Sequence, residues 1–150
     1  MVDQDARRHL AELLRYLVAG LVTNDEFEAR YPAASRDRAI RQIVDEGAWF
    51  LYDDTHEHKL AGKFRVSVLQ RHEVARWVLF LEGTLEYEWP VVPWLVGLAL
   101  VPLNIFTLGL VGGFVQRIAR RGVPADVWPF RRRADFEAAL LMSPYLRGEV

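Results

Sequence analysis

The chain has 150 residues, contains no cysteine, and carries 19 Lys and Arg residues against 20 Asp and Glu residues, a formal net charge of −1. A length of this order accommodates one ordinary domain with its own core. The lack of cysteine excludes disulfides, thiolate catalysis and cysteine-based zinc sites. The balanced charge gives no support for a nucleic-acid-binding protein, which would ordinarily be strongly basic.

The charge is unevenly distributed along the chain. Residues 1–90 hold 12 basic and 16 acidic residues, whereas residues 91–150 hold 7 and 4. All seven basic residues of the second part are arginines. Such a local excess of positive charge suits a surface that faces phospholipid headgroups or an acidic partner. The expected headgroup contacts are Arg117, Arg120 and Arg121.

The N-terminal region predicts a helical hairpin over residues 5–31. Gly20 suits the left-handed position that ends a helix, and Thr23 to Glu26 match a capping box that begins the next one. The pair Tyr31-Pro32 ends this second helix. The first helix has an apolar face of Leu10, Leu13, Leu14, Leu17 and Val18, with Arg7, Arg8, Glu12 and Arg15 expected opposite.

The pattern LxxLLxxLxxGLVTNDEFE, from Leu10 to Glu28, resembles the short helical hairpin known as the SHOCT domain. The resemblance implies a small module for partner binding or self-association, of a kind often attached to membrane-associated bacterial proteins. In the usual pattern a basic helix follows the Phe, whereas here Tyr31-Pro32 interrupts it. The whole chain is also similar to uncharacterised small bacterial proteins with TNDEFE, EYEWP and VWPF segments, which implies no activity. The expected partner contacts are Leu10, Leu13, Leu14, Leu17 and Phe27.

Further helices are expected near residues 35–52 and 67–82, so that residues 1–90 form a mostly helical part. Ser67 to Gln70 match a second capping box, and Gly83 is a natural stop. A short helix over residues 134–142 is expected within an Arg-rich C-terminal tail, residues 116–150. The fold class is therefore mostly α. In helix 35–52 the expected buried residues are Ile40, Ile43, Val44, Trp49 and either Phe50 or Leu51.

Residues 91–115 form an uncharged stretch of 25 residues, 15 of which are Val, Leu, Ile or Phe. As one helix it would be about 37 Å long, more than the ~30 Å hydrocarbon core of a bilayer. Its apolar residues favour insertion by roughly 4–9 kcal/mol, although prolines, glycines and Asn104 oppose it. We expect this segment to associate with the membrane. The alternative is a soluble, mostly helical protein that buries it in its core or a dimer interface.

The flanks of this segment decide between two modes of insertion. The positive-inside rule places the arginines that follow it in the cytoplasm. A single transmembrane helix would then export residues 1–90, although the N-terminus has no apolar signal region. A re-entrant hairpin avoids that conflict, with Pro102, Leu103 and Asn104 as its hinge and Trp94 at the interface. We therefore expect a protein of the inner (cytoplasmic) membrane, with its bulk facing the cytoplasm and oligomerisation protecting the hinge.

Only one cluster in the sequence suggests a chemical site. Two histidines two residues apart share a face of an extended segment and could bind a metal with a neighbouring carboxylate. An ordinary polar loop explains the same residues, and HExxH, GxSxG, Walker and GxGxxG motifs do not occur. The expectation is therefore a non-enzymatic protein without a cofactor, which binds membrane lipid and a protein partner or another copy. The weak metal candidates are Asp53, Asp54, His56 and His58.

Overall fold

The structure, a computed structural model, describes residues 1–53, 55–89 and 125–142. The described residues are mostly helical, which confirms the expected fold class, and none of them belongs to a β-strand. The α-helices are α1 (Gln4–Val18), α2 (Asn24–Arg30), α3 (Arg38–Glu46), α4 (Val68–Glu82) and α7 (Arg133–Met142). Short 3-10 helices are η1 (Ala48–Phe50), η2 (Gly62–Phe64) and η3 (Ala125–Val127).

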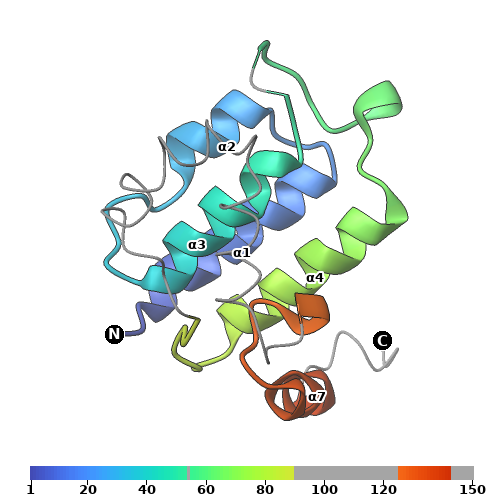
Figure 1. Cartoon of the computed structure of the whole chain (residues 1–150). Coiled ribbons are helices and arrows are strands. Elements are labelled where there is room, and N and C mark those ends of the chain that lie inside the picture. The colour runs from blue at the N-terminus through green and yellow to red at the C-terminus, as the bar shows by residue number, and fades with distance from the viewer. Residues whose placement is uncertain (54, 90–124, 143–150) are drawn as a thin grey trace, which may run out of the picture.

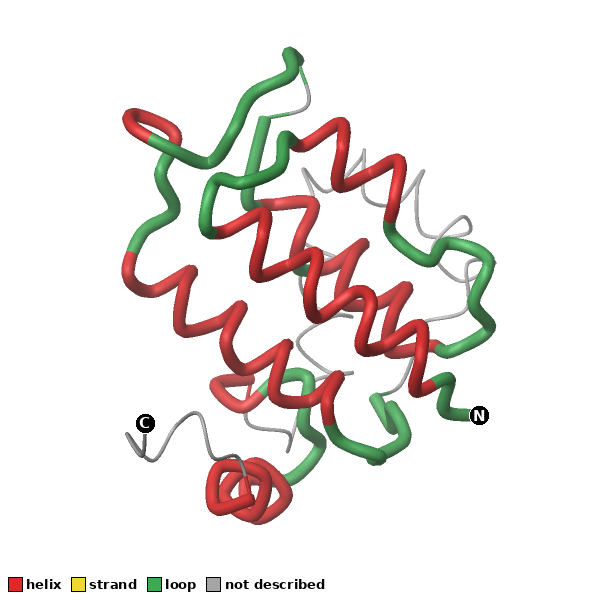
Figure 2. Tube along the Cα trace, turned by 180° about the vertical axis from the view of Figure 1, so that it is seen from behind, coloured by secondary structure: helices red, strands yellow, loops and turns green. Residues whose placement is uncertain are grey.

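Three helices, α1, α3 and α4, contact one another and form the body of the protein (Figure 1). The view from behind shows the same three helices side by side (Figure 2). The shorter α2 packs on α1, and α7 packs on α4. The Gln4 side chain donates to the carbonyl oxygens of Leu81 and Glu82. The start of α1 therefore lies beside the end of α4. The pair α1 and α4 therefore runs antiparallel.

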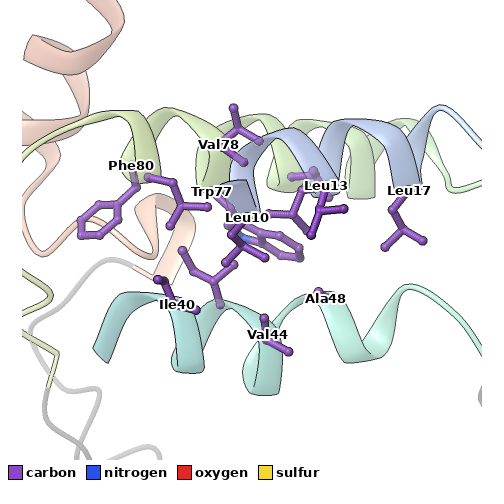
Figure 3. Close-up of a cluster of buried hydrophobic side chains, with 14 of the residues drawn as sticks. Leu10, Leu13, Leu17, Ile40, Val44, Ala48, Trp77, Val78 and Phe80 are labelled. Atoms are coloured by element: carbon purple, nitrogen blue, oxygen red, sulfur yellow. The ribbon is translucent and has the colours of Figure 1, made fainter. Parts of the chain in front are cut away.

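The core lies where these three helices meet. Leu10 of α1, Ile40 of α3 and Trp77 of α4 point toward one another (Figure 3), and each is at most 4% exposed. The leucines of α1 fall at helical spacing, so one face of the helix enters the core. Burying a side chain of this size contributes about 1.5–3 kcal/mol. The hydrophobic effect therefore holds the body together.

Local sequence signals place the helix ends as predicted. Thr23 accepts from the backbone N–H of Glu26, and the Glu26 side chain accepts from the N–H of Thr23. Ser67 and Gln70 form the same reciprocal pair at the start of α4. Gly20 has φ +69°, the left-handed conformation that favours glycine. Both capping boxes and the turn after α1 are confirmed.

The helix expected over residues 35–52 is shorter than predicted. α3 ends at Glu46, and the next residue, Gly47, leaves the helical conformation with φ −129° and ψ −74°. A side chain at this position would have no room, because its Cβ would lie 2.7 Å from the Ile43 carbonyl oxygen and 2.9 Å from the Trp77 ring. The chain then turns as η1, which leaves Trp49 43% exposed. The expectation that Trp49 is buried was wrong. The prediction left open whether Phe50 or Leu51 is buried. Phe50 is 73% exposed, and Leu51 is buried.

Arg7 was expected on the charged face of the first helix, but its side chain is 0% exposed. It donates twice to the Asp37 carboxylate, over 2.6 and 3.1 Å, and to the carbonyl oxygens of Gly83 and Leu85. Its guanidinium also lies 5.2 Å from the centre of the Phe80 ring. This one side chain therefore joins α1, the start of α3 and the segment after α4.

Asp37 completes this buried ion pair and caps α3 through the N–H of Ala39. Burial raises the pKa of its carboxyl, but hydrogen bonds from Arg7 and from the backbone N–H groups of Asp3 and Ala39 outweigh that effect. The net result is a pKa lowered from its usual value. The carboxylate is therefore held in its ionised form.

The membrane predictions concern residues that the structure does not describe. Within the described ranges, no helix is long and apolar enough to cross a bilayer. The apolar segment 91–115 lies outside these ranges. The predicted membrane and headgroup residues that lie outside with it are Trp94, Pro102, Leu103, Asn104, Arg117, Arg120 and Arg121.

Candidate functional site

The chain segments on either side of the apolar region meet in the structure. The Trp89 indole N–H donates to the carbonyl oxygens of Pro129, over 2.9 Å, and Phe130, over 3.3 Å. The Trp128 indole N–H donates in turn to the hydroxyl of Tyr87, over 3.1 Å. We call these five residues the neck. They are separated by some forty positions in the sequence, yet they form one connected cluster.

The neck is attached to the end of α4 by aromatic packing. Phe130 is 1% exposed, and its ring meets that of Phe80 edge-on with 5.1 Å between centres. The Trp128 ring meets that of Trp77 edge-on at 5.7 Å. Such pairs contribute about 0.5–1.5 kcal/mol beyond burial alone. Trp89 therefore belongs to the core, and Trp128 is partly buried against it.

Two arginines fix the neck further through carbonyl oxygens. Arg76 of α4 donates to the carbonyl oxygen of Trp128, over 2.7 Å, and to that of Asp126. Arg131 donates to the carbonyl oxygen of Glu88, over 3.2 Å. Hydrogen bonds from charged donors are stronger than neutral ones. Trp89 and Pro129, which flank the residues 90–124 that the structure does not describe, are therefore held side by side on the body.

A second feature is a groove between α1 and α4, which we call the α1–α4 groove. Its volume is about 910 Å³, within the range of small-molecule sites. One side of α4 forms a wall, and the opposite side includes the small residues Ala19, just after α1, and Ala61 and Gly62, at the start of η2. The lining residues are Arg15, Val18, Ala19, Leu60, Ala61, Gly62, Arg65, Arg71, Val74, Ala75, Val78, Leu79 and Glu82.

The five residues expected to bind a partner lie elsewhere. They are in the core and at most 3% exposed, because the apolar face of α1 packs against α4 and α3. They were predicted to contact a partner; in the folded chain they are already covered by the other helices. The five residues are Leu10, Leu13, Leu14, Leu17 and Phe27.

The structure brings the two candidate metal ligands His56 and His58 together, with ring centres 4.9 Å apart. The His58 ring also packs on Phe64, with 4.3 Å between centres. The Asp53 carboxylate instead accepts from the N–H of Thr55, and this bond is the main cause of its lowered pKa. Among the residues that the structure describes, no group of three His, Cys, Asp or Glu side chains is placed to hold a metal. Asp54 is outside them.

A buried asparagine explains the shape of this loop. Asn24 is 1% exposed; its side-chain oxygen accepts from the N–H of His58, over 2.8 Å, and its amide donates to the carbonyl oxygen of His56. Its own backbone N–H donates to the carbonyl oxygen of His58. The loop is therefore fastened to the start of α2. This contact supports a structural role for the histidine segment.

Sequence reasoning missed the neck, the groove and the role of Arg7. A signal for Arg7 was present, because Arg7, Leu10 and Leu14 share the helical spacing of one face. The neck and the groove arise from contacts between distant segments, which no local pattern indicates. No family model matches this chain, and neither a curated protein nor a solved structure is found to match it.

Proposed function

We propose that this chain is a non-enzymatic, membrane-associated bacterial protein whose residues 91–115 enter the bilayer as a re-entrant hairpin. The helical body would stay on the cytoplasmic side. The uncharged composition of the segment supports insertion. The observation that carries the proposal is the neck, since Trp89 and Pro129 are joined by a hydrogen bond.

The neck argues against a single crossing. If residues 91–115 crossed the bilayer once, Trp89 and residue 116 would lie on opposite faces. Residues 116–124 would then have to return to Pro129 through the hydrocarbon, a distance that they could cover only when nearly fully extended, at about 30 Å. Their three arginines would cost roughly 8–10 kcal/mol at the centre of the bilayer. A hairpin avoids this cost because its two ends lie on the same face.

Cysteine labelling tests the hairpin, because the natural chain has no cysteine. Single cysteines at Thr84 and Gln116 should both react with a membrane-impermeant maleimide in inside-out vesicles and be protected in right-side-out ones. Ala34→Cys, in the exposed segment before α3, is the reference for the cytoplasmic body. Labelling of positions 84 and 116 from opposite faces would refute the hairpin.

A second candidate is a soluble interaction protein, of the inhibitor or immunity type, that covers residues 91–115 with its own body or another copy. Two apolar side chains at the end of α7 favour this second candidate. Leu141 is 66% exposed and Met142 is 79% exposed, so α7, which lies beside the neck, offers apolar surface for such a contact. Fractionation separates the two candidates. A membrane protein stays in the pellet after carbonate washing and is released by detergent, and Leu103→Asp should weaken that retention. Recovery in the supernatant without detergent would favour the second candidate.

A further inference from the structure

The charges of the α1–α4 groove are concentrated at one end. Arg65 and Arg71 lie just before and within the first turn of α4, and both are exposed. Among the residues that the structure describes, neither guanidinium group forms a hydrogen bond or an ion pair; the pairing of these two residues is through their backbone, where both N–H groups are bonded. At the other end Arg15 forms an ion pair with Glu82. One end of the groove is therefore a neutral pair, and the other has two free positive charges.

The floor of the groove between these ends is apolar, formed by side chains that are otherwise buried in the core and at most 8% exposed. Val74, Val78 and Leu79 follow Arg71 on one side of α4, at the spacing of a single helical face. From Arg71 to Glu82 the helix rises by about 16 Å, which is the length of this wall. Exposed Ala75 lies along it and leaves it hollow. The groove thus combines a cationic head with an apolar channel.

We propose that the α1–α4 groove binds a single-chain anionic amphiphile, such as a fatty acid. Its carboxylate would pair with the guanidinium groups of Arg65 and Arg71, which suit the planar geometry of carboxylates. Its chain would lie along Val74, Val78 and Leu79. Binding at this site does not require residues 91–115 to be inserted, so it goes beyond the membrane role proposed above.

A cysteine footprint on the full chain tests this site. In the Ala75→Cys variant, the rate of maleimide labelling reports whether the groove is occupied. Dodecanoate should slow labelling at least fivefold, whereas its uncharged methyl ester should act only at much higher concentration. Ala34→Cys, outside the groove, is the control, and dodecanoate should leave its labelling rate unchanged.

Substitution of the two arginines tests the charge requirement. Arg65→Gln and Arg71→Gln should each raise the half-protecting concentration of dodecanoate up to about fivefold, as expected for exposed ion pairs. Arg36→Gln and Arg38→Gln are matched controls, since both arginines are exposed and lie outside the groove. These two substitutions should leave the half-protecting concentration of dodecanoate unchanged. The half-protecting concentration of the methyl ester should be the same in all four variants.

Three results would overturn the proposal. Equal protection of the cysteine at position 75 by dodecanoate and by its methyl ester would show that the groove binds apolar chains without selecting for a negative charge. A cysteine at position 75 that reacts freely at every dodecanoate concentration would show that the site does not bind it. A cysteine that is unreactive without ligand would show that the groove is covered by the chain itself or by another copy. None of these results depends on whether the protein pellets with membranes, so the two proposals can fail separately.

Discussion

The buried ion pair between Arg7 and Asp37 gives the sharpest test of the fold. Arg7→Met removes the guanidinium but keeps an unbranched side chain in its place. The Asp37 carboxylate, 3% exposed, then loses both of its hydrogen bonds from Arg7, and the carbonyl oxygens of Gly83 and Leu85 lose theirs. Removing one partner of a buried pair costs about 3–5 kcal/mol. We expect a loss of this size in the free energy of unfolding.

Urea denaturation of the purified full chain, followed by circular dichroism, measures this loss. Arg8→Met is the matched control, because the Arg8 side chain is 69% exposed and its removal should cost no more than about 0.5 kcal/mol. The double variant Arg7→Met with Asp37→Asn removes the stranded charge and should recover roughly 1–3 kcal/mol of the loss. If Arg7→Met were as mild as the Arg8 control, the buried position of Arg7 and the reasoning built on it would be refuted.

Three further predictions address pH, packing and the neck. Because the pKa of Asp37 is lowered in the folded chain, its ionisation stabilises the fold above the unfolded pKa of about 4 and is lost as the pH falls through the folded pKa. Asp37→Asn should therefore flatten the acid side of a plot of unfolding free energy against pH, and an unchanged slope would contradict this assignment. Gly47→Ala should destabilise by at least about 1–3 kcal/mol in the same urea assay, because the new Cβ meets the Trp77 ring at 2.9 Å; a neutral effect would show that this contact relaxes freely. Trp89→Phe keeps an aromatic ring but removes the N–H that binds Pro129, so it should cost about 1 kcal/mol beyond the change in packing. Thermal unfolding measures this effect, with Trp49→Phe as the control because the Trp49 ring is partly exposed. Equal decreases in the unfolding temperature of the two variants would argue against the hydrogen bond between Trp89 and Pro129.

The features that could be predicted from the sequence are those with local causes. The capping boxes at Thr23 and Ser67 depend on residues three positions apart, so the helix starts were recognisable. The close contact at Gly47, after the end of α3, was not recognisable, because the ring that leaves no room for a side chain there belongs to Trp77, thirty positions later. Arg7 was misplaced because residue type was given more weight than its spacing from Leu10.

The candidate sites were harder to predict because they depend on distant contacts. The neck joins Trp89 to Pro129 across a stretch with no pattern of its own to indicate the pairing. The groove needs the antiparallel arrangement of α1 and α4 before its lining residues become neighbours. The two histidines were correctly expected to be close together. The role of Asn24 in fastening their loop became evident only in the fold.

The neck also has a consequence for how this chain can change. Because Trp89 and Pro129 are held together by contacts of the body itself, the two ends of the segment between them are fixed close together. The entropic cost of closing such a segment grows only logarithmically with its length. Insertions, deletions or replacement of residues within 90–124 should therefore be tolerated by the helices. In the proposed hairpin, a different apolar segment could therefore replace residues 91–115 while Trp89 and Pro129 keep their contacts with the body.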